Sequence, residues 1–459
     1  MRAIFIFAVI FLTVFQSANA GGDLTNLQGI GMARTYTAIA RGINSVGINP
    51  ANLGYPDKGT VTFNLLNFGT KVGSDLIDLD LYEKYFTGDK NGDPVFLKDA
   101  DKRKILEVYP SGLAQTGFNF EFKLLSFSYQ HSTVGGFVVS VIERTGVNFL
   151  MPKDYVQFLL YGNPLGSRYD FSKTYFNSMW YREYSLSYGR RIPRFIFMKS
   201  MTAGFSIKMI HGFGFAELSR NNTHFTTDAN AKIAGRVDYQ AKFAGLDLLR
   251  EESDVEYSPF PKPAGSGYGI DLGISGFVNN ELSIGIALTD VGAIMWKQNT
   301  YENSGNAAFD FDDPRTAQEQ LNNLDTLLNG TNKPIKNFSS GLPTVLRIGA
   351  AYQFDKAPFI NKFPGELLLA LDYNQGFNNL AGNTTKPRFS LGVEYKPWKW
   401  LPLRTGVSLG GVDGFNMGFG FGILFSFMDI EFATENFDAA ISPRSISRAS
   451  FAFGMKIRI

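Results

Sequence analysis

The chain has 459 residues, including 48 glycines and 43 Phe, 20 Tyr and 4 Trp, and its 44 basic side chains are balanced by 42 acidic ones. This balance leaves no basic surplus to neutralise phosphates, which disfavours a nucleic-acid binder. The chain has no cysteine, and this excludes disulfide frameworks, thiolate metal sites and thiol catalysis.

The first twenty residues have the pattern of a signal peptide. Arg2 gives a positive start, an apolar run over 3–15 is interrupted only by Thr13, and Ala18 and Ala20 supply small residues for cleavage. We expect residues 1–20 to be removed after Ala20. A short membrane anchor is the alternative, but the run is shorter than the ~20 residues needed to span a bilayer. No later stretch has eighteen consecutive apolar residues, which leaves an exported soluble protein or a membrane β-barrel.

The remaining chain shows period-2 alternation in segments of about ten residues, which is typical of strands with one apolar face. In the last segment Phe451, Phe453 and Met455 alternate with Ala452 and Gly454. Fourteen segments are predicted as strands: 60–68, 113–130, 135–144, 182–191, 199–212, 266–277, 281–290, 343–354, 365–374, 386–396, 402–410, 414–422, 425–434 and 448–459. A weaker segment at 230–243 is assigned to a loop.

The connections between these segments alternate between long and short. Outer-membrane barrels have an even number of antiparallel strands, short periplasmic turns and longer extracellular loops. The sequence therefore predicts an all-β protein, a transmembrane antiparallel β-barrel of about fourteen strands over residues 59–459. A soluble β-sandwich is the alternative, but it would not need the asymmetry of the loops.

Two long loops have helical patterns. Asp313 and Pro314 open one predicted helix, and Asp154 is expected to cap another that runs to Tyr161. Their apolar side chains either pack against the other loops or form a landing site for a hydrophobic ligand; the candidate ligand-binding residues are Phe158, Leu159, Leu321, Leu324 and Leu328.

Aromatic and small residues have characteristic positions in the predicted barrel. Trp180 and Trp296 are expected at the ends of long loops, and Trp398 and Trp400 lie in a short turn, as in the aromatic girdles of a membrane barrel. The inward positions are small: Gly269, Gly273, Gly285, Ala287, Gly349, Gly392, Gly406, Gly418, Gly420 and Gly454. They either leave space for a plug or a ligand, or relieve crowding where strands bend. Gly135 and Gly136 are a candidate kink or gap in the wall.

Residues 29–53 read GIGMARTYTAIARGINSVGINPANL and are too irregular for a strand. This stretch resembles the N-terminal hatch of FadL-type outer-membrane transporters and is similar to PorV-type barrels associated with secretion. The matching positions are Gly29, Gly31, Met32, Ala33, Ala38, Ala40, Asn49, Pro50, Ala51 and Leu53. The resemblance implies a hatch over residues 21–58 with a gate at Asn49, Pro50 and Ala51. Arg34, Tyr36 and Arg41 depart from the small-residue pattern.

The Asn-Pro-Ala triplet also has a physical interpretation. Pro50 fixes its own φ and favours an extended Asn49, whose side chain can bond neighbouring backbone groups. The triplet therefore predicts a rigid turn, which suits a plug. The alternative is an ordinary surface turn.

The sequence gives catalysis little support. His131, His211 and His224 show no metal-ligand spacing, and no residue is nominated as a nucleophile. We expect neither an enzyme nor a cofactor.

The resemblance implies passive uptake of hydrophobic small molecules, such as fatty acids or hydrocarbons, across the outer membrane of a Gram-negative-type bacterium. The alternative is a PorV-like scaffold for protein secretion or surface attachment, without transport activity. The expected partners are outer-membrane lipid, a hydrophobic small molecule or a secreted protein, and the barrel-assembly machinery during biogenesis, with no nucleic acid. An apolar tunnel would favour transport, and a polar, filled lumen with an exposed apolar loop patch would favour docking.

Overall fold

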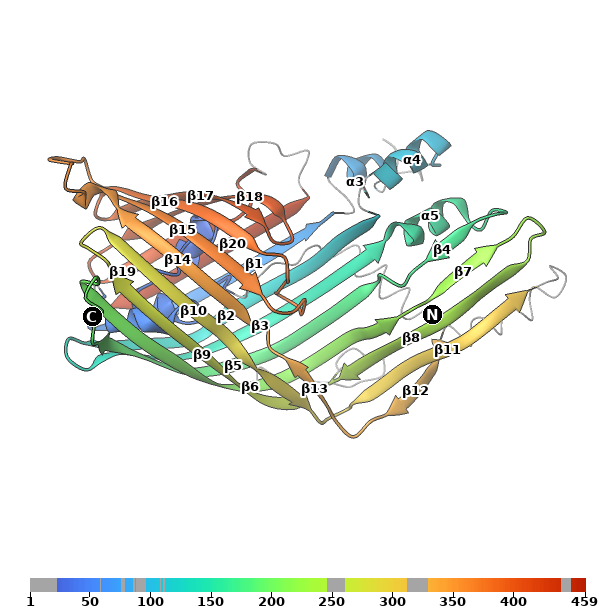
Figure 1. Ribbon diagram of the computed structural model, residues 1–459, viewed down its shortest axis with the longest axis horizontal. Helices are drawn as coiled ribbons and strands as arrows, with labels where there is room; N and C mark the ends of the chain where they lie inside the picture. Colours follow the sequence, from blue (N-terminus) through green and yellow to red (C-terminus); the bar gives the residue numbers. More distant parts are fainter. Residues whose placement is uncertain are drawn as a thin grey trace.

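The computed structural model describes residues 23–57, 59–75, 79–85, 87, 96–107, 109, 112–245, 261–311, 329–438 and 447–459. Fourteen antiparallel strands form the closed wall of a barrel, and its interior contains the N-terminal residues (Figure 1). These strands are β1 (Val61–Ser74), β2 (Leu113–His131), β3 (Gly135–Pro152), β5 (Tyr175–Ile192), β6 (Ser200–Asn221), β9 (Gly265–Phe277), β10 (Leu282–Trp296), β14 (Val345–Gln353), β15 (Glu366–Gly376), β16 (Arg388–Trp398), β17 (Leu401–Gly410), β18 (Gly414–Leu424), β19 (Met428–Thr434) and β20 (Arg448–Arg458).

Each wall strand pairs with the next one along the chain, and β20 pairs back on β1 from Thr62↔Arg458 to Gly73↔Arg448. All fourteen strands lie where the alternation predicts them, so the predicted fold class is confirmed. The expected gap at Gly135 and Gly136 is wrong, because Gly136 pairs with Gln130 of β2 and with Gly189 of β5.

The outer face of the wall is apolar because alternate side chains point outward. On β9, Ile270, Leu272 and Ile274 are 43–53% exposed, whereas the inward Asp271 and Ser275 are buried. A continuous belt of such side chains is stable only against lipid. None of the described helices is long and apolar enough to cross a membrane.

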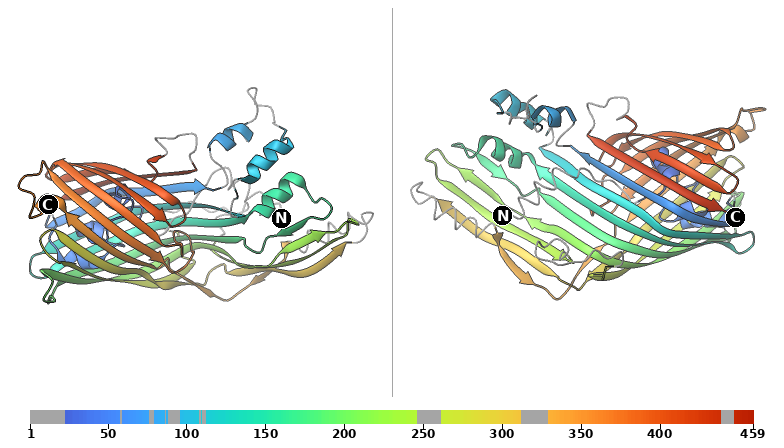
Figure 2. Two further views of the ribbon diagram at one scale, coloured as in Figure 1. Left: turned by 45° about the horizontal axis from the view of Figure 1, so that its top comes forward. Right: turned by 180° about the vertical axis from the view of Figure 1, so that it is seen from behind.

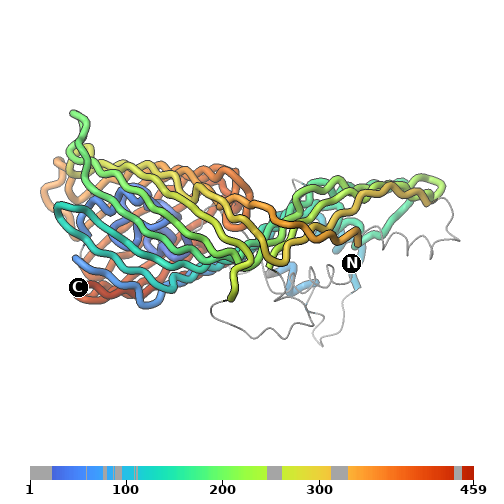
Figure 3. Tube along the Cα trace, turned by 90° about the horizontal axis from the view of Figure 1, so that it is seen from below, coloured from blue at the N-terminus to red at the C-terminus, as the bar shows by residue number. Residues whose placement is uncertain are grey.

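On the side of the long loops, several wall strands continue beyond the barrel and carry an extracellular extension (Figures 2 and 3). It consists of β4 (Arg168–Asp170), β7 (His224–Thr227), β8 (Ile233–Ala244), β11 (Tyr301–Phe311) and β12 (Thr331–Pro334), which pair in the order β4–β7–β8–β11–β12. A further short strand, β13 (Phe338–Gly341), pairs with the end of β10.

In and near the extension, two sequence predictions are wrong: the loop at 230–243 and the girdle positions of two tryptophans. The segment at 230–243 is not a loop, since β8 pairs with β6, β7 and β11. Trp180 does not lie at a strand end either, because β5 starts at Tyr175. Its ring packs against that of Phe213, with a ring-centroid distance of 5.0 Å. Trp296 ends β10 but is fully buried. Both corrections arise because strands of the extension lie in water and lack the alternation of a lipid-facing strand.

Short helices lie on the extracellular side: α3 (Leu79–Tyr85), α4 (Asp99–Glu107) and α5 (Lys153–Tyr161). A 3-10 turn, η5 (Phe354–Lys356), lies in the connection from β14 to β15. Asp154 does not cap α5, because the helix begins one residue earlier and Pro152 is its N-cap. The Asp154 carboxylate instead accepts a hydrogen bond from the amide of Asp170 (2.6 Å). The helix expected after Asp313 falls largely within 312–328, outside the described residues, as does the expected signal peptide with Ala18 and Ala20.

Residues 23–57, here called the plug, lie inside the barrel (Figure 1). They form α2 (Leu27–Gly31) and two 3-10 turns, η1 (Gly42–Ser45) and η2 (Pro50–Gly54). Asn26 caps α2 by accepting a hydrogen bond from the amide of Gly29 (2.9 Å). Nearly every plug residue is buried, and the plug therefore fills the lumen at its own level.

Candidate functional site

Asn49 and Pro50 hold the last turn of the plug against the wall. Asn49 is extended (φ −158°, ψ 102°), and its side chain accepts a hydrogen bond from the amide of Ala51 (3.1 Å). Its amide nitrogen donates to the carbonyl of Thr37 (3.2 Å) and to the hydroxyl of Ser275 on β9 (2.9 Å). Because Asn49 is fully buried, one side chain joins two turns of the plug to the barrel.

Inward glycines let the plug backbone contact the wall directly. A Cβ added at Gly273 would stand 2.0 Å from Oδ1 of Asn49, and one at Gly406 would stand 2.6 Å from the carbonyl oxygen of Met32. Similar close approaches to the plug occur at Gly69, Gly136, Gly189, Gly204, Gly285, Gly349, Gly392, Gly418, Gly420 and Gly454. The small inward residues therefore make room for the plug, although Gly269 faces Leu342 instead.

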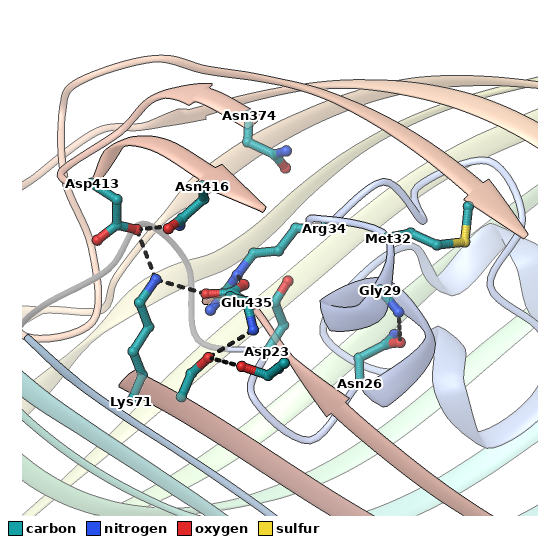
Figure 4. Close-up of polar contacts among 12 residues, drawn as sticks. Asp23, Asn26, Gly29, Met32, Arg34, Lys71, Asn374, Asp413, Asn416 and Glu435 are labelled. Carbon is teal, nitrogen blue, oxygen red and sulfur yellow. Dashed lines mark hydrogen bonds and ion pairs between the residues drawn. The ribbon is translucent and has the colours of Figure 1, made fainter. Parts of the chain in front are cut away.

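A buried ionic cluster ties the plug to the wall (Figure 4). Arg34 of the plug pairs with Asp23 and with Glu435, which directly follows β19. Lys71 of β1 lies 2.7 Å from Glu435 and 2.7 Å from Asp413. The side chains of Arg34 and Lys71 are 1% and 0% exposed. A buried charge is stable only when it is paired, which explains why an arginine stands in a stretch of small residues.

Further polar contacts hold the plug on other strands. The amides of Tyr36 and Thr37 donate to the carboxylate of Asp372 on β15, at 3.2 and 3.0 Å. Gln28 donates to Glu431 on β19 (3.1 Å). None of these contacts is a strand pairing, so the plug can shift without breaking a hydrogen bond of the wall.

Tyr36 and Arg41, which also depart from the small-residue pattern of the hatch, have packing partners as well. Tyr36 packs in a buried cluster with Met32, Ala351 and Ala370. The Arg41 guanidinium lies 5.0 Å from the centroid of the Tyr55 ring, a favourable cation–π distance.

A second ionic cluster makes the lumen polar beside the plug. Lys208 on β6 contacts Glu183 (3.4 Å), Asp271 (2.9 Å) and Asp290 (2.7 Å). Arg144 on β3 lies 3.5–3.7 Å from three carboxylates, including Glu183 and Asp290. At this level the described residues form a filled, polar lumen and no apolar tunnel. By the criterion given above, this lumen counts toward docking, and transport would require the plug to move.

The loop between β15 and β16, residues 377–387, folds across the extracellular mouth and is here called the cap. The carbonyl of Asn379 accepts a hydrogen bond from Asn148 of β3 (2.9 Å), and the amide of Ala381 donates to Asn177 of β5 (2.7 Å). The cap therefore links β15 and β16 to β3 and β5, which are not their neighbours in the wall.

A small cavity separates the cap from the plug. It lies between Leu24 of the plug, Ala381 and Gly382 of the cap, and Glu121 and Arg144 of the wall. Its volume is about 20 Å³, enough for about one water molecule, whereas pockets for small ligands have volumes of roughly 300–1,000 Å³. The barrel is therefore closed by two successive barriers.

Apolar side chains gather at the mouth beside the cap. Trp296, Phe215 and Ile210 are at most 1% exposed, and the indole N–H of Trp296 donates to Ser340 (2.8 Å). The same buried cluster contains Met179, Tyr181, Ala244, Ala264, Ile294, Phe338, Leu342, Leu380 and Ala381. This buried cluster joins the cap to the ends of β5, β6 and β10.

Comparison with known families identifies the family of this chain. A family model described as "Family of unknown function (DUF5723)" matches residues 50–434. The chain belongs to this family. A comparison with curated proteins finds no match for this DUF5723 chain.

Solved structures similar to the DUF5723 chain include two toluene transporters and a FadL homologue. TbuX of Ralstonia pickettii is 12% identical over 96% of this chain and 99% of that chain, with a TM-score of 0.49. TodX of Pseudomonas putida is 11% identical over 97% and 98%, with a TM-score of 0.43. A Pseudomonas aeruginosa FadL homologue is 12% identical over 96% and 98%, with a TM-score of 0.39.

In the DUF5723 chain, Phe158 and Leu159 of α5 lie on the extracellular extension. The Phe158 ring makes edge contacts with Tyr169 and Phe225, each with a centroid distance of 5.4 Å, and Tyr155 stacks on Phe171 at 4.2 Å. Burial raises the pKa of Tyr155, which keeps its phenol neutral. Leu159 is 62% exposed. Phe158 therefore packs in an aromatic cluster, and Leu159 is open to solvent; a landing site for a ligand stays a prediction. Leu321, Leu324 and Leu328 lie outside the described residues.

Sequence reasoning missed the charged residues that line the lumen of the DUF5723 chain. Lys71, Asp271 and Arg404 occupy inward positions of strands whose outward positions are apolar. A charge at an inward position was a usable signal, because such a group needs a partner inside the barrel. In the described part of the chain, no group of three or more His, Asp or Glu residues could hold a metal ion.

Proposed function

We propose that this outer-membrane barrel takes up small hydrophobic molecules, such as fatty acids or hydrocarbons, by passive transfer. The observation that carries the proposal is the buried apolar cluster at the mouth, which lies next to a cap and above a plug that is not part of the sheet. Transfer of apolar surface from water into such an environment is favourable by ~25 cal/mol per Å², so no energy source is required.

The proposed path begins on the extracellular extension. A ligand adsorbs at Phe158 and Leu159, passes to the mouth cluster, and continues when the cap and the plug move. The plug would shift at Asn49, Pro50 and Ala51, where the hydrogen bond from Asn49 to Ser275, and no strand pairing, holds it to the wall. Both barriers must move, because a cavity of about 20 Å³ is too small for such a ligand.

The test measures uptake of labelled fatty acids and labelled aromatic hydrocarbons by cells with and without the protein. We expect the initial rate for at least one compound to fall when the protein is deleted and to return when it is restored. Equal rates across the panel would reject uptake and favour the alternative of a scaffold for secretion or surface attachment.

A surface variant tests the entry step. Leu159→Asp puts a charge at the proposed landing site and should lower the initial uptake rate without affecting the fold, since the side chain is largely exposed. Phe195→Asp is the matched control, because Phe195 is 62% exposed in a turn at the opposite end of the barrel. Equal rates for the two variants would reject Leu159 as part of the path.

A further inference from the structure

Three neighbouring wall strands carry polar side chains whose donors are unused. Arg347, Asn374 and Arg388 are directly opposite one another on β14, β15 and β16, in the register Arg347↔Asn374↔Arg388. Directly opposed residues of an antiparallel pair point to the same face, and all three are at most 3% exposed inside the barrel. Their side chains therefore extend together into the extracellular end of the lumen.

Several N–H groups of this trio have no acceptor. The unused donors are Nε and Nη2 of Arg388, Nε of Arg347 and Nδ2 of Asn374. Asn374 uses only its oxygen, which accepts from Nη1 of Arg347 (3.2 Å). Buried polar groups are almost always hydrogen-bonded, and an unsatisfied one indicates a bound water or ion or a functional role. Four such donors at adjacent positions point to one shared acceptor.

The surrounding charges do not supply that acceptor. Asp23, Glu435, Asp413 and Asp75 are each paired with one or two of Arg34, Arg347, Lys71 and Arg448. These four carboxylates match four cations, and the Arg388 guanidinium is a fifth cation. A further buried carboxylate, Asp372 on β15, accepts the amides of Tyr36 and Thr37 and forms no ion pair within the described residues. Within the described residues, no carboxylate forms an ion pair with Arg388. A buried guanidinium without a counter-ion is strongly unfavourable.

Gly411 lies beside the Arg388 side chain. A Cβ built at Gly411 would meet no atom nearer than Cδ of Arg388, at 3.8 Å. Gly411 belongs to the turn from β17 to β18, whose Gly414 is exposed at the extracellular rim.

We propose that Arg347, Asn374 and Arg388 bind one small oxyanion, of the phosphate, sulfate or carboxylate class, inside the barrel. Planar guanidinium groups match the paired oxygens of such anions. The anion supplies the missing negative charge and accepts the unused hydrogen bonds. Since Arg347 also contacts Asp23 of the plug (3.2 Å), the bound anion lies one residue away from the plug.

The site is tested with the purified full-length barrel in detergent. Its melting temperature is measured in chloride buffer and with added phosphate, sulfate or octanoate at constant ionic strength. We expect at least one oxyanion to raise Tm saturably by about 2–4 °C. A response to phosphate or sulfate identifies a free inorganic anion as the source, and a response to octanoate alone identifies the head group of an amphiphile. No response to any of them overturns the proposal.

Two variants separate this site from general salt effects. Asn374→Asp places a carboxylate between the two arginines, so Tm in chloride should rise and the oxyanion response should disappear. Arg388→Met should also remove the response. The controls Asn64→Asp, at another buried inward asparagine, and Arg190→Met, at an exposed arginine, should respond like the wild type. An unchanged response in Asn374→Asp would reject the site. These outcomes are independent of hydrocarbon uptake, so failure of either proposal leaves the other intact.

Discussion

At the scale of single residues, the plug is held in the barrel by buried carboxylates that each pair with two cationic side chains. Glu435 contacts both Arg34 of the plug and Lys71 of the wall, and Asp413 contacts both Lys71 and Arg448. A charge with two partners keeps one when the other is removed. The cluster therefore weakens gradually, and no single substitution of a cation leaves Glu435 or Asp413 without an ion-pair partner.

Replacing Lys71 with Met tests this cluster. The change leaves Glu435 and Asp413 with one cationic partner each, and we expect a loss of stability near the lower end of the ~3–5 kcal/mol typical of a broken buried pair. The melting temperature of the purified barrel measures the loss. The double variant Lys71→Met with Glu435→Gln should recover part of it, and an unchanged Tm in the single variant would contradict the pairing.

Gly273 tests the close fit between wall and plug. Gly273→Ala places a Cβ against Oδ1 of Asn49 and should displace the turn at Pro50 at a cost of about 1–3 kcal/mol. We expect the ion conductance of the barrel in a planar bilayer to increase. Gly341→Ala is the matched control, because its nearest neighbour would lie at 3.7 Å; equal conductance in both variants would argue against displacement of the plug.

At the scale of elements, the cap is held by fewer contacts than the plug. Asn148 and Asn177 join it to β3 and β5, and its Asn378 and Asn383 donate to the carbonyls of Leu342 and Thr344. The plug has ion pairs, amide hydrogen bonds and close backbone contacts on many strands. The cap is thus the barrier that opens at the lower cost.

Substituting both asparagines with Ala should loosen the cap. Two hydrogen bonds at about 1 kcal/mol each correspond to a roughly thirty-fold increase in the open population, measured as faster amide exchange in residues 378–384. Asn163→Ala removes hydrogen bonds to Ser167 and Thr227 in the extracellular extension and should leave that exchange unchanged. Unchanged exchange in the double variant would mean that other contacts hold the cap.

Strand positions followed from the sequence, but strand lengths did not. Within the membrane one face meets lipid, so alternation is clear, as in β9 and β20. Above it, β6 continues to Asn221 with both faces covered or wet, and the periodic signal ends near Gly212. The ionic cluster joins residues as distant as Arg34 and Glu435, a pairing that depends on how the barrel closes and that local patterns do not contain. The Asn49 turn was predictable because proline and asparagine act on their immediate neighbours.

At the scale of the whole molecule, the barrel and the extracellular extension form one continuous sheet with two environments (Figure 3). The outer face of the barrel is apolar. In the extension, by contrast, β12 is exposed along its entire length and carries the polar residues Asn332 and Lys333. This change in the outer face sets the depth of the protein in the membrane.

The membrane orientation gives a prediction for intact cells. An epitope inserted in the exposed turn at 229–231, between β7 and β8, should be labelled by an impermeant antibody. The same epitope inserted at 195–197, in a turn between β5 and β6 at the other end, should be labelled only after the outer membrane is permeabilised. The reverse pattern would overturn the assignment of the two ends.

The glycine contacts between plug and wall also constrain the order of assembly. Gly454 of β20 lies against Leu27, and Gly69 of β1 lies against Leu24, so the two strands that close the ring both touch the plug. A lumen shaped this closely around a folded backbone leaves no route for threading the plug in afterwards. We therefore expect the N-terminal segment to be in place before β20 meets β1, which makes the plug a template for the final step of biogenesis.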